Sequence, residues 1–261
     1  MSTRPGGELT GLVVLVTGAT GAAGRSTVRA LAAAGADVVA VGRDERRLAA
    51  LFSTVDGVFL EVADLTDRQQ CEELADRIRA QHHRIDGLVH LVGGWRGAPQ
   101  FTANSDDDWA FLSRTLIDGL RHITLAVHDD LAASADGRAV IVSATAVDRP
   151  TPGGANYAAA KAATEGWMGA LAESFVRVAA VAATAPHAHA GGEHTSAAAT
   201  VLVIKALVDD AMRDASPDKS FDGFPMSTFS PPASSRCSPR TPANSTEPAS
   251  SWARRLIGRT K

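Results

Sequence analysis

Uninterrupted apolar runs alternate with alanine-rich stretches along most of this 261-residue chain, and this alternation restricts its fold more than any other feature. Runs of this kind are typical of strands that are buried on both faces of a sheet. The stretches between them are long enough to be helices that cross from one parallel strand to the next, and such crossovers are right-handed. We therefore predict an α/β fold with a doubly wound parallel sheet, whose ligands lie beyond the carboxyl ends of the strands.

The boundaries of the predicted elements follow from the same pattern. Strands are expected at residues 12–17, 37–41, 58–62, 87–92 and 138–143, and helices at 22–34, 44–52, 67–82, 106–131 and 155–174. Two segments compete for a sixth strand, 176–182 and 201–208. We favour the second, because a loop rich in glycine and histidine precedes it, whereas no turn signal precedes the first.

The composition divides the chain into one folded unit and a tail. The chain is 45% hydrophobic, which is enough for one large domain with a buried core. We place this domain, which contains the doubly wound, Rossmann-like sheet predicted above, over residues 1–215. Serine, proline and threonine dominate the remainder, so we predict an atypical, disordered C-terminal tail over residues 216–261. A frame-shifted or degenerate C-terminus is a second interpretation of this tail, and it would remove one edge of the sheet.

Charge and cysteine usage exclude several classes of protein. The formal net charge of −3 gives no broad electrostatic footprint for nucleic acid. No apolar run reaches the length of a membrane span, and the N-terminus lacks the apolar core of a signal peptide. The two cysteines, Cys71 and Cys237, are far apart, which fits a reducing compartment. We expect a cytoplasmic protein that binds neither nucleic acid nor membranes.

A glycine-rich loop, TGATGAAG at residues 17–24, joins the first predicted strand to the first predicted helix. Glycines permit a tight turn and the close approach of a pyrophosphate, while the helix N-terminus offers free N–H groups and the positive end of its dipole. This context predicts a dinucleotide site that includes Gly18, Thr20, Gly21, Ala22 and Gly24. A turn that is merely rich in glycine is the alternative.

The single tyrosine of the chain, Tyr157, stands four residues before Lys161, one of four lysines. In the predicted helix both side chains lie on one face. We expect the lysine charge to lower the pKa of the phenol from about 10 toward neutral pH, which suits a general acid/base. A chance pair on a solvated helix is the alternative.

Taken together, the loop and the Tyr157/Lys161 pair resemble the short-chain dehydrogenase/reductase family over about residues 9–175. The loop matches the TGxxx(A/G)xG form of the family and, through Gly21, also the TGxxGxxG form of its longer members. The resemblance implies an NAD(P)-dependent oxidoreductase that interconverts a carbonyl compound and a secondary alcohol by hydride transfer. It also implies that Tyr157 is the general acid/base and that Lys161 holds the nicotinamide ribose.

The resemblance assigns further cofactor contacts. Asp64, after the third strand, would bond the adenine amino group with Leu65 beside the ring, and Gly93 would permit close backbone approach after the fourth strand. Arg43 follows the second strand, where an acidic residue would bind the ribose of NAD. Its guanidinium suits a 2′-phosphate, so we expect NADP, with NAD as the alternative. Asp64 as a helix cap and Arg43 as a surface residue are the plainer interpretations.

The expected hydroxyl partner of the substrate departs from the family pattern. Ser143 ends the fifth predicted strand, where its hydroxyl can polarise the substrate carbonyl. It lies 14 residues before Tyr157, whereas the family spacing is more often 13, which falls on Ala144. Thr145 is the second candidate for this hydroxyl.

Two polar sites of the family are also replaced. Leu116 stands where the family often has an asparagine that relays protons from the lysine, and His90 and Leu91 replace two asparagines after the fourth strand. We assign no chemistry to His90. These departures support a second hypothesis, a nucleotide-cofactor-binding protein with little or no catalytic activity.

The remaining expectations concern metals and partners. The residues His187, His189, Glu193 and His194 are irregularly spaced, so no metal site is predicted. Trp95, Arg96 and Phe101 are candidates for the lining of a substrate pocket. The resemblance implies a homo-oligomer, a dimer or tetramer, formed through the fourth and fifth predicted helices, and a small-molecule carbonyl or alcohol as substrate.

Overall fold

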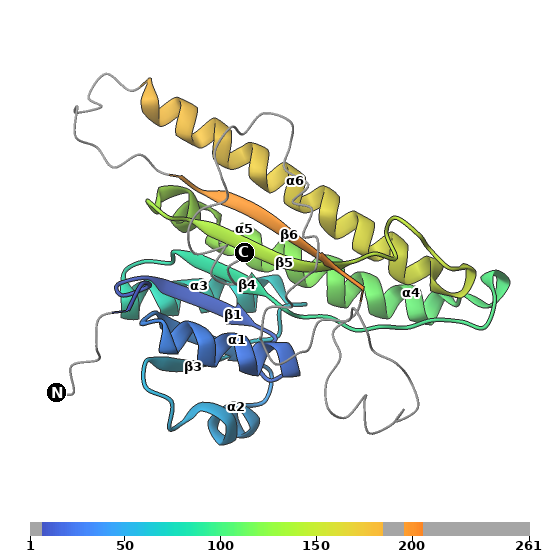
Figure 1. The fold of residues 1–261 in the computed structure, drawn as a ribbon, viewed down its shortest axis with the longest axis horizontal. Coiled ribbons are helices and arrows are strands. Elements are labelled where there is room, and N and C mark those ends of the chain that lie inside the picture. The colour runs from blue at the N-terminus through green and yellow to red at the C-terminus, as the bar shows by residue number, and fades with distance from the viewer. Residues whose placement is uncertain (1–6, 185–195, 206–261) are drawn as a thin grey trace, which may run out of the picture.

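Within residues 7–184 and 196–205, which the computed structural model describes, six parallel strands form one sheet (Figure 1). They are β1 (Val13–Thr17), β2 (Asp37–Gly42), β3 (Val58–Val62), β4 (Gly87–His90), β5 (Arg138–Ala144) and β6 (Ala198–Ile204). Their order is β3-β2-β1-β4-β5-β6, so the chain fills one half of the sheet and then returns to the middle to fill the other. This order confirms the predicted doubly wound, Rossmann-like fold.

Helices cover both faces of the sheet (Figure 1). One face carries α1 (Ala22–Ala33) and α2 (Glu45–Phe52), and the other carries α3 (Arg68–His82), α5 (Gly119–Ala133) and α6 (Ala155–Ala183). Successive strand residues belong to different apolar clusters: Leu15 packs with the α3/α5/α6 side and Val16 with the α1/α2 side. Burial on both faces is the reason that the strands have continuous apolar sequences.

The predicted helix over residues 106–131 is helical but divided. α4 (Asp106–Leu112) passes through a π-helical turn, η2 (Ser113–Asp118), into α5. A π turn accommodates an extra residue within a helix and changes the direction in which side chains point. Here Leu116 is buried against Leu112 and Ala160, so the turn packs α4 against α6.

The C-terminal part of the fold differs from one prediction and confirms another. Residues 176–182, the less favoured candidate for a sixth strand, continue α6 to Ala183, nine residues beyond the predicted helix end. The segment is rich in alanine and holds neither glycine nor proline to stop a helix. The sixth strand is β6, which pairs with β5 over seven residues and begins three residues before the favoured segment.

A buried carboxylate ties together the amino ends of the central strands. Asp86 directly precedes β4 and accepts hydrogen bonds from the backbone N–H of Val13 (2.9 Å) and from Ser134 Oγ (2.6 Å). Arg84 adds a two-pronged ion pair to the same carboxylate, at 2.7 Å for each oxygen. The bonds from Val13 and Ser134 join β1 and the end of α5 to the start of β4, so Asp86 fixes the sheet at the end opposite the predicted ligand site.

Several predictions fall outside the described residues. These are the tail at 216–261, Cys237, residues 206–208 and the histidine-rich segment around His187. In the described part of the chain, no group of side chains is arranged to hold a metal ion. Among these residues, no helix has the length and apolar character needed to cross a membrane.

Candidate active site

The glycine-rich loop lies at the carboxyl end of β1 and leads directly into α1. Gly21 precedes the helix, its N–H donates to the Gly18 carbonyl (3.1 Å), and Ala22 begins the first turn. The first turn of α1 contains no acidic side chain, so the N–H groups and the positive end of the dipole are unopposed there. This is the arrangement that binds phosphate groups at helix N-termini.

Two glycines of the loop have no room for a side chain. Gly18 has a φ of +72°, and a Cβ there would lie 2.7 Å from the backbone of Leu91. A Cβ on Gly24 would lie 2.2 Å from the Gly18 carbonyl oxygen and 2.7 Å from Ala19 Cα. Both contacts are with backbone, so these positions require glycine for the loop to close on itself.

Thr20 and Arg43 lie close to the carboxyl end of β2. A Cβ on Gly42 would meet Thr20 Cγ2 at 3.2 Å, so the loop after β1 packs directly beside the end of β2. Arg43 is the next residue and its side chain is exposed. Arg47, in the first turn of α2, donates to the Thr20 carbonyl at 3.4 Å. The Arg47 guanidinium therefore contacts this end of the loop, and the exposed Arg43 lies at the adjacent end of β2.

Asp64 and Leu65 follow β3 and border the same edge. Asp64 accepts bonds from Thr66 N (3.0 Å) and Thr66 Oγ1 (2.8 Å), while α3 is capped by Asp67, so the capping alternative for Asp64 is wrong. Burial raises the pKa of Asp64, but the Thr66 bonds and the charges of Arg43 and Arg114 outweigh burial and lower it. Leu65 is buried. Asp64 is thus a carboxylate in the electrostatic reach of Arg43.

Tyr157 and Lys161 lie one turn apart near the start of α6, as predicted from their spacing. Tyr157 packs against the apolar group formed by Leu112, Leu116 and Ala160. Burial raises the pKa of the phenol, and the predicted lowering by the lysine charge is therefore wrong for the protein without ligands. The sequence could not reveal how deeply the ring is packed, and desolvation of the phenolate decides the direction.

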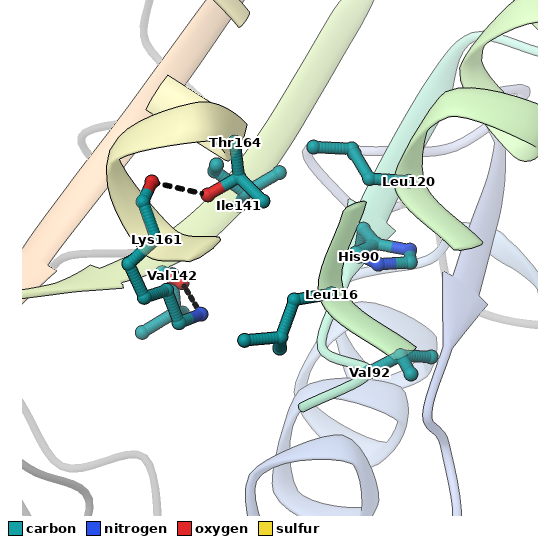
Figure 2. Close-up of a pocket in the computed structure, with 8 residues that line it drawn as sticks. All are labelled: His90, Val92, Leu116, Leu120, Ile141, Val142, Lys161 and Thr164. Carbon is teal, nitrogen blue, oxygen red and sulfur yellow. Dashed lines mark hydrogen bonds between the residues drawn. The ribbon is translucent and has the colours of Figure 1, made fainter. Parts of the chain in front are cut away.

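Lys161 is buried, and its ammonium donates to the carbonyl oxygen of Val142 in β5 at 2.7 Å (Figure 2). Burial lowers the pKa of this amine to about 8, against the opposing charge of Glu165. A lysine that titrates near neutral pH and sits beside a phenol is a feature of functional sites rather than of solvated surfaces. A chance pair was expected on a solvated helix face, whereas Lys161 is buried and Tyr157 is partly buried.

Ser143 is held by Glu165, a residue that was not among the predicted site residues. Its hydroxyl donates to Glu165 Oε1 at 2.6 Å. Glu165 is four residues after Lys161 in α6, so the same helical spacing that pairs Tyr157 with Lys161 could have identified it. Ala144, at the usual family spacing, is buried, and Thr145 is exposed.

His90 is a second residue that the sequence reading left without a role. It ends β4, is fully surrounded by protein, and its Nδ1 lies 2.8 Å from Thr17 Oγ1 of the nucleotide loop. Burial, together with the charge of Lys161, lowers the pKa of its imidazole to about 3. Gly93, three residues on, is exposed and a Cβ there would meet nothing within 4 Å. Gly93 thus has open space around it, whereas His90 is buried and borders only a small pocket.

The segment after β4 presents aromatic side chains at the surface. Trp95 is 71% exposed and Phe101 is 66% exposed. The guanidinium of Arg96 lies 4.2 Å from the centre of the Phe111 ring and pairs with Asp108 at 3.2 Å. Because the segment leaves the carboxyl end of the sheet, these residues are placed where a substrate would enter.

Hydrogen bonds fasten this segment to the turn that precedes Tyr157. Asn104 Nδ2 donates to the Pro152 carbonyl (2.9 Å), and Ala98 N donates to the Gly153 carbonyl (2.8 Å). Asn156 Nδ2 in turn donates to the Ser105 carbonyl at 3.0 Å. A Cβ on Gly153 would meet the Ala98 carbonyl oxygen at 1.8 Å, so the two segments touch backbone to backbone.

Comparison with known proteins agrees with this arrangement. The family model described as short chain dehydrogenase matches residues 12–196. The 3-oxoacyl-[acyl-carrier-protein] reductase FabG of Thermotoga maritima is 32% identical over 183 residues, 67% of this chain and 74% of its own. The NADP-dependent 3-hydroxy acid dehydrogenase YdfG of Escherichia coli is 32% identical over 152 residues, 58% of this chain and 61% of its own.

Solved structures share the fold. A short-chain type dehydrogenase/reductase from Mycobacterium ulcerans has a TM-score of 0.69 at 18% identity, covering 85% of this chain and 80% of its own. An NADPH-bound short chain oxidoreductase from Pseudomonas aeruginosa, described as containing an atypical catalytic center, has a TM-score of 0.67 at 23% identity, covering 81% and 77%. At these identities the likeness is one of architecture.

Proposed function

The chain belongs to the short-chain dehydrogenase family of oxidoreductases, and we propose that it uses NADP to interconvert a small carbonyl compound and a secondary alcohol. The observation that carries this proposal is the placement of Tyr157 and Lys161. The two side chains lie one turn apart on α6, Lys161 buried and Tyr157 partly buried, at the carboxyl side of the sheet where the nucleotide loop also opens.

The cofactor site fits a dinucleotide in its chemistry. Gly18, Gly21 and Gly24 let the loop turn tightly into α1, whose first N–H groups are proposed to bind the pyrophosphate, with Thr20 and Ala22 in the same turn. Asp64 and Leu65 are proposed to contact the adenine, and Gly93 the nicotinamide half. The bound cofactor supplies the hydride.

The preference for NADP is proposed from Arg43. This guanidinium follows β2 where an NAD-binding chain has an acidic residue, and the neighbouring Arg47 adds positive charge. The NADP-dependent 3-hydroxy acid dehydrogenase, at 32% identity, supports the same choice. NAD remains the alternative that a binding experiment can distinguish.

Proton transfer is proposed for Tyr157, which would donate to the carbonyl oxygen during reduction and accept in the reverse direction. Lys161 would stabilise the phenolate and hold the nicotinamide ribose. Ser143 is proposed as donor to the substrate oxygen, and for this its hydroxyl must turn away from Glu165. Glu165 would therefore compete with the substrate for that hydroxyl.

The assembly and location are further proposals. Trp109 of α4 and Leu125 of α5 are large apolar side chains left exposed on the helices where the family resemblance places an interface. We propose a dimer or tetramer formed through α4, α5 and α6, in the cytoplasm. Light scattering on the purified protein measures the mass directly, and a monomer would reject this part of the proposal.

A second function, cofactor binding with little or no catalysis, is favoured by one specific observation. The Ser143 hydroxyl is engaged by Glu165, while Ala144 offers no hydroxyl at the usual position. Thermal-shift titration with NADPH and NADH tests the site, and a panel of ketones, 3-oxoesters and aldehydes followed by NADPH absorbance tests turnover. Turnover that is abolished in Tyr157→Phe, with NADPH binding retained, supports the enzyme; binding without turnover supports the second function.

A further inference from the structure

A small pocket lies beside the side chain of Lys161 (Figure 2). It is lined by residues of β4, β5, η2, α5 and α6 and of the segment after β4, namely His90, Val92, Leu116, Leu120, Ile141, Val142, Lys161 and Thr164. Its free space suffices for about one water molecule. The polar side chains that border this space are those of His90, Lys161 and Thr164.

His90 contributes such a polar atom. Its imidazole is fixed on one side by Thr17, whose Oγ1 lies 2.8 Å from Nδ1. Its Nε2 is buried and has no hydrogen-bond partner among the described residues. The large majority of buried side-chain polar atoms in proteins have a hydrogen-bond partner. We therefore expect the unpaired Nε2 to have a partner in the water-sized space beside it.

Lys161 faces the pocket from the other side. Figure 2 shows its side chain extending from α6 toward the Val142 carbonyl, with His90 on the opposite side of the pocket. The ammonium has three N–H donors, of which the Val142 carbonyl takes one. Thr164 does not donate into this space, because its hydroxyl proton is used on the Lys161 carbonyl at 2.7 Å.

We propose that one water molecule bridges His90 Nε2 and Lys161 Nζ, and that His90 is thereby a positioning residue for the lysine. In this bridge Nδ1–H donates to Thr17 Oγ1, the water donates to the lone pair on Nε2, and the water oxygen accepts from Lys161. An ammonium across the pocket favours this tautomer, because it directs the imidazole lone pair toward the positive charge. The low pKa of His90 fits, since burial and Lys161 keep its ring neutral.

The bridge gives the lysine a polar partner on the side opposite Val142. The titratable groups around Lys161 in the described structure are Tyr157 and Glu165 on its own helix and His90 on β4. η2 and α5 present only leucines to the pocket, Leu116 and Leu120. The inference uses the proposed function only in attributing catalysis to Lys161, and the bridge itself exists with or without turnover.

Two substitutions of His90 separate the bridge from the Thr17 contact. Glutamine can place a polar atom near the position of Nε2, whereas asparagine reaches only the position of Nδ1. The chain has four lysines, so selective ¹³C-lysine labelling gives few NMR signals, and Lys161→Arg assigns the one of interest. His82→Gln is the matched control, since His82 also has a buried Nε2 but packs against Phe59, away from this pocket.

We expect the Lys161 signal to titrate near pH 8 in the wild type, in His90→Gln and in His82→Gln, and about one pH unit lower in His90→Asn. Identical titration of Lys161 in all four proteins overturns the bridge. Should His90→Asn not fold, ¹⁵N-imidazole NMR of the wild type decides: an unprotonated Nε2 at pH 7 supports the bridge, and a protonated Nε2 overturns it. Neither readout needs cofactor or turnover, so an inactive protein would reject the enzyme and leave this test intact.

Discussion

Replacing the buried Lys161 by methionine is expected to stabilise the cofactor-free protein at neutral pH. Burial lowers the pKa of this lysine from 10.5 to about 8. Below pH 8 the folded chain therefore carries a charge that its surroundings disfavour, and methionine, of similar length, removes that charge. The buried amine of Lys161 thus lowers the stability of the folded protein at neutral pH.

The magnitude follows from the difference between the two pKa values. At pH 7 the unfavourable contribution of Lys161 is about 3 kcal/mol, and the lost hydrogen bond to Val142 reduces the gain from methionine by about 1 kcal/mol. Between pH 8 and pH 10.5 the unfolded chain binds a proton that the folded chain lacks, so wild-type stability rises with pH there. By pH 10 less than about 1 kcal/mol of the penalty is left.

Urea unfolding of wild type and Lys161→Met at pH 7, 8, 9 and 10 measures this directly. The variant should be more stable at pH 7, and the difference between the two proteins should move by about 2.5 kcal/mol in favour of the wild type by pH 10. Lys205→Met, a change at an exposed lysine, controls for the loss of one positive charge. A difference that stays constant from pH 7 to pH 10 would refute the reasoning.

Three further predictions concern the two ends of the sheet. Gly24→Ala should weaken NADPH binding at least about tenfold in calorimetry, because its Cβ would sit 2.2 Å from the Gly18 carbonyl oxygen. Gly166→Ala, with open space around its Cβ, should leave NADPH binding unchanged. Arg43→Ala should raise the Kd for NADPH about 10- to 100-fold and leave that for NADH nearly unchanged; equal effects on both would remove Arg43 from the 2′-phosphate site. Asp86→Ala should lower the free energy of unfolding by about 3–5 kcal/mol, since it strands buried Val13 N–H and Ser134 Oγ. The exposed Asp76→Ala should cost under about 1 kcal/mol, and similar costs for the two would contradict the importance of burial.

Much of the fold could be predicted from the sequence because burial on both faces leaves a distinct pattern. The strands from residue 12 to residue 143 can be placed to within two residues, since each is largely apolar. The end of α6 could not be placed this way. Residues 176–182 are apolar and short, and such a run fits a strand and a helix equally well until tertiary contacts decide.

The site was predictable only as far as it depends on spacing along one element. Helical periodicity placed Tyr157 beside Lys161. The contacts of Ser143 and His90 cross between elements, from β5 to α6 and from β4 to β1. The pKa direction of Tyr157 depends on how η2 and α4 pack over the ring, which no local pattern encodes.

The bonds between the segment after β4 and the turn before Tyr157 have a consequence for engineering. The contacts of Asn104 and Gly153 couple the position of the segment after β4 to that of the start of α6, although about fifty residues separate them in sequence. A graft that exchanges residues 95–105 for those of a relative would therefore move the phenol as well, unless the turn at 151–154 is carried with it. If Tyr157 has the proposed role, substrate range and proton transfer would have to be exchanged together.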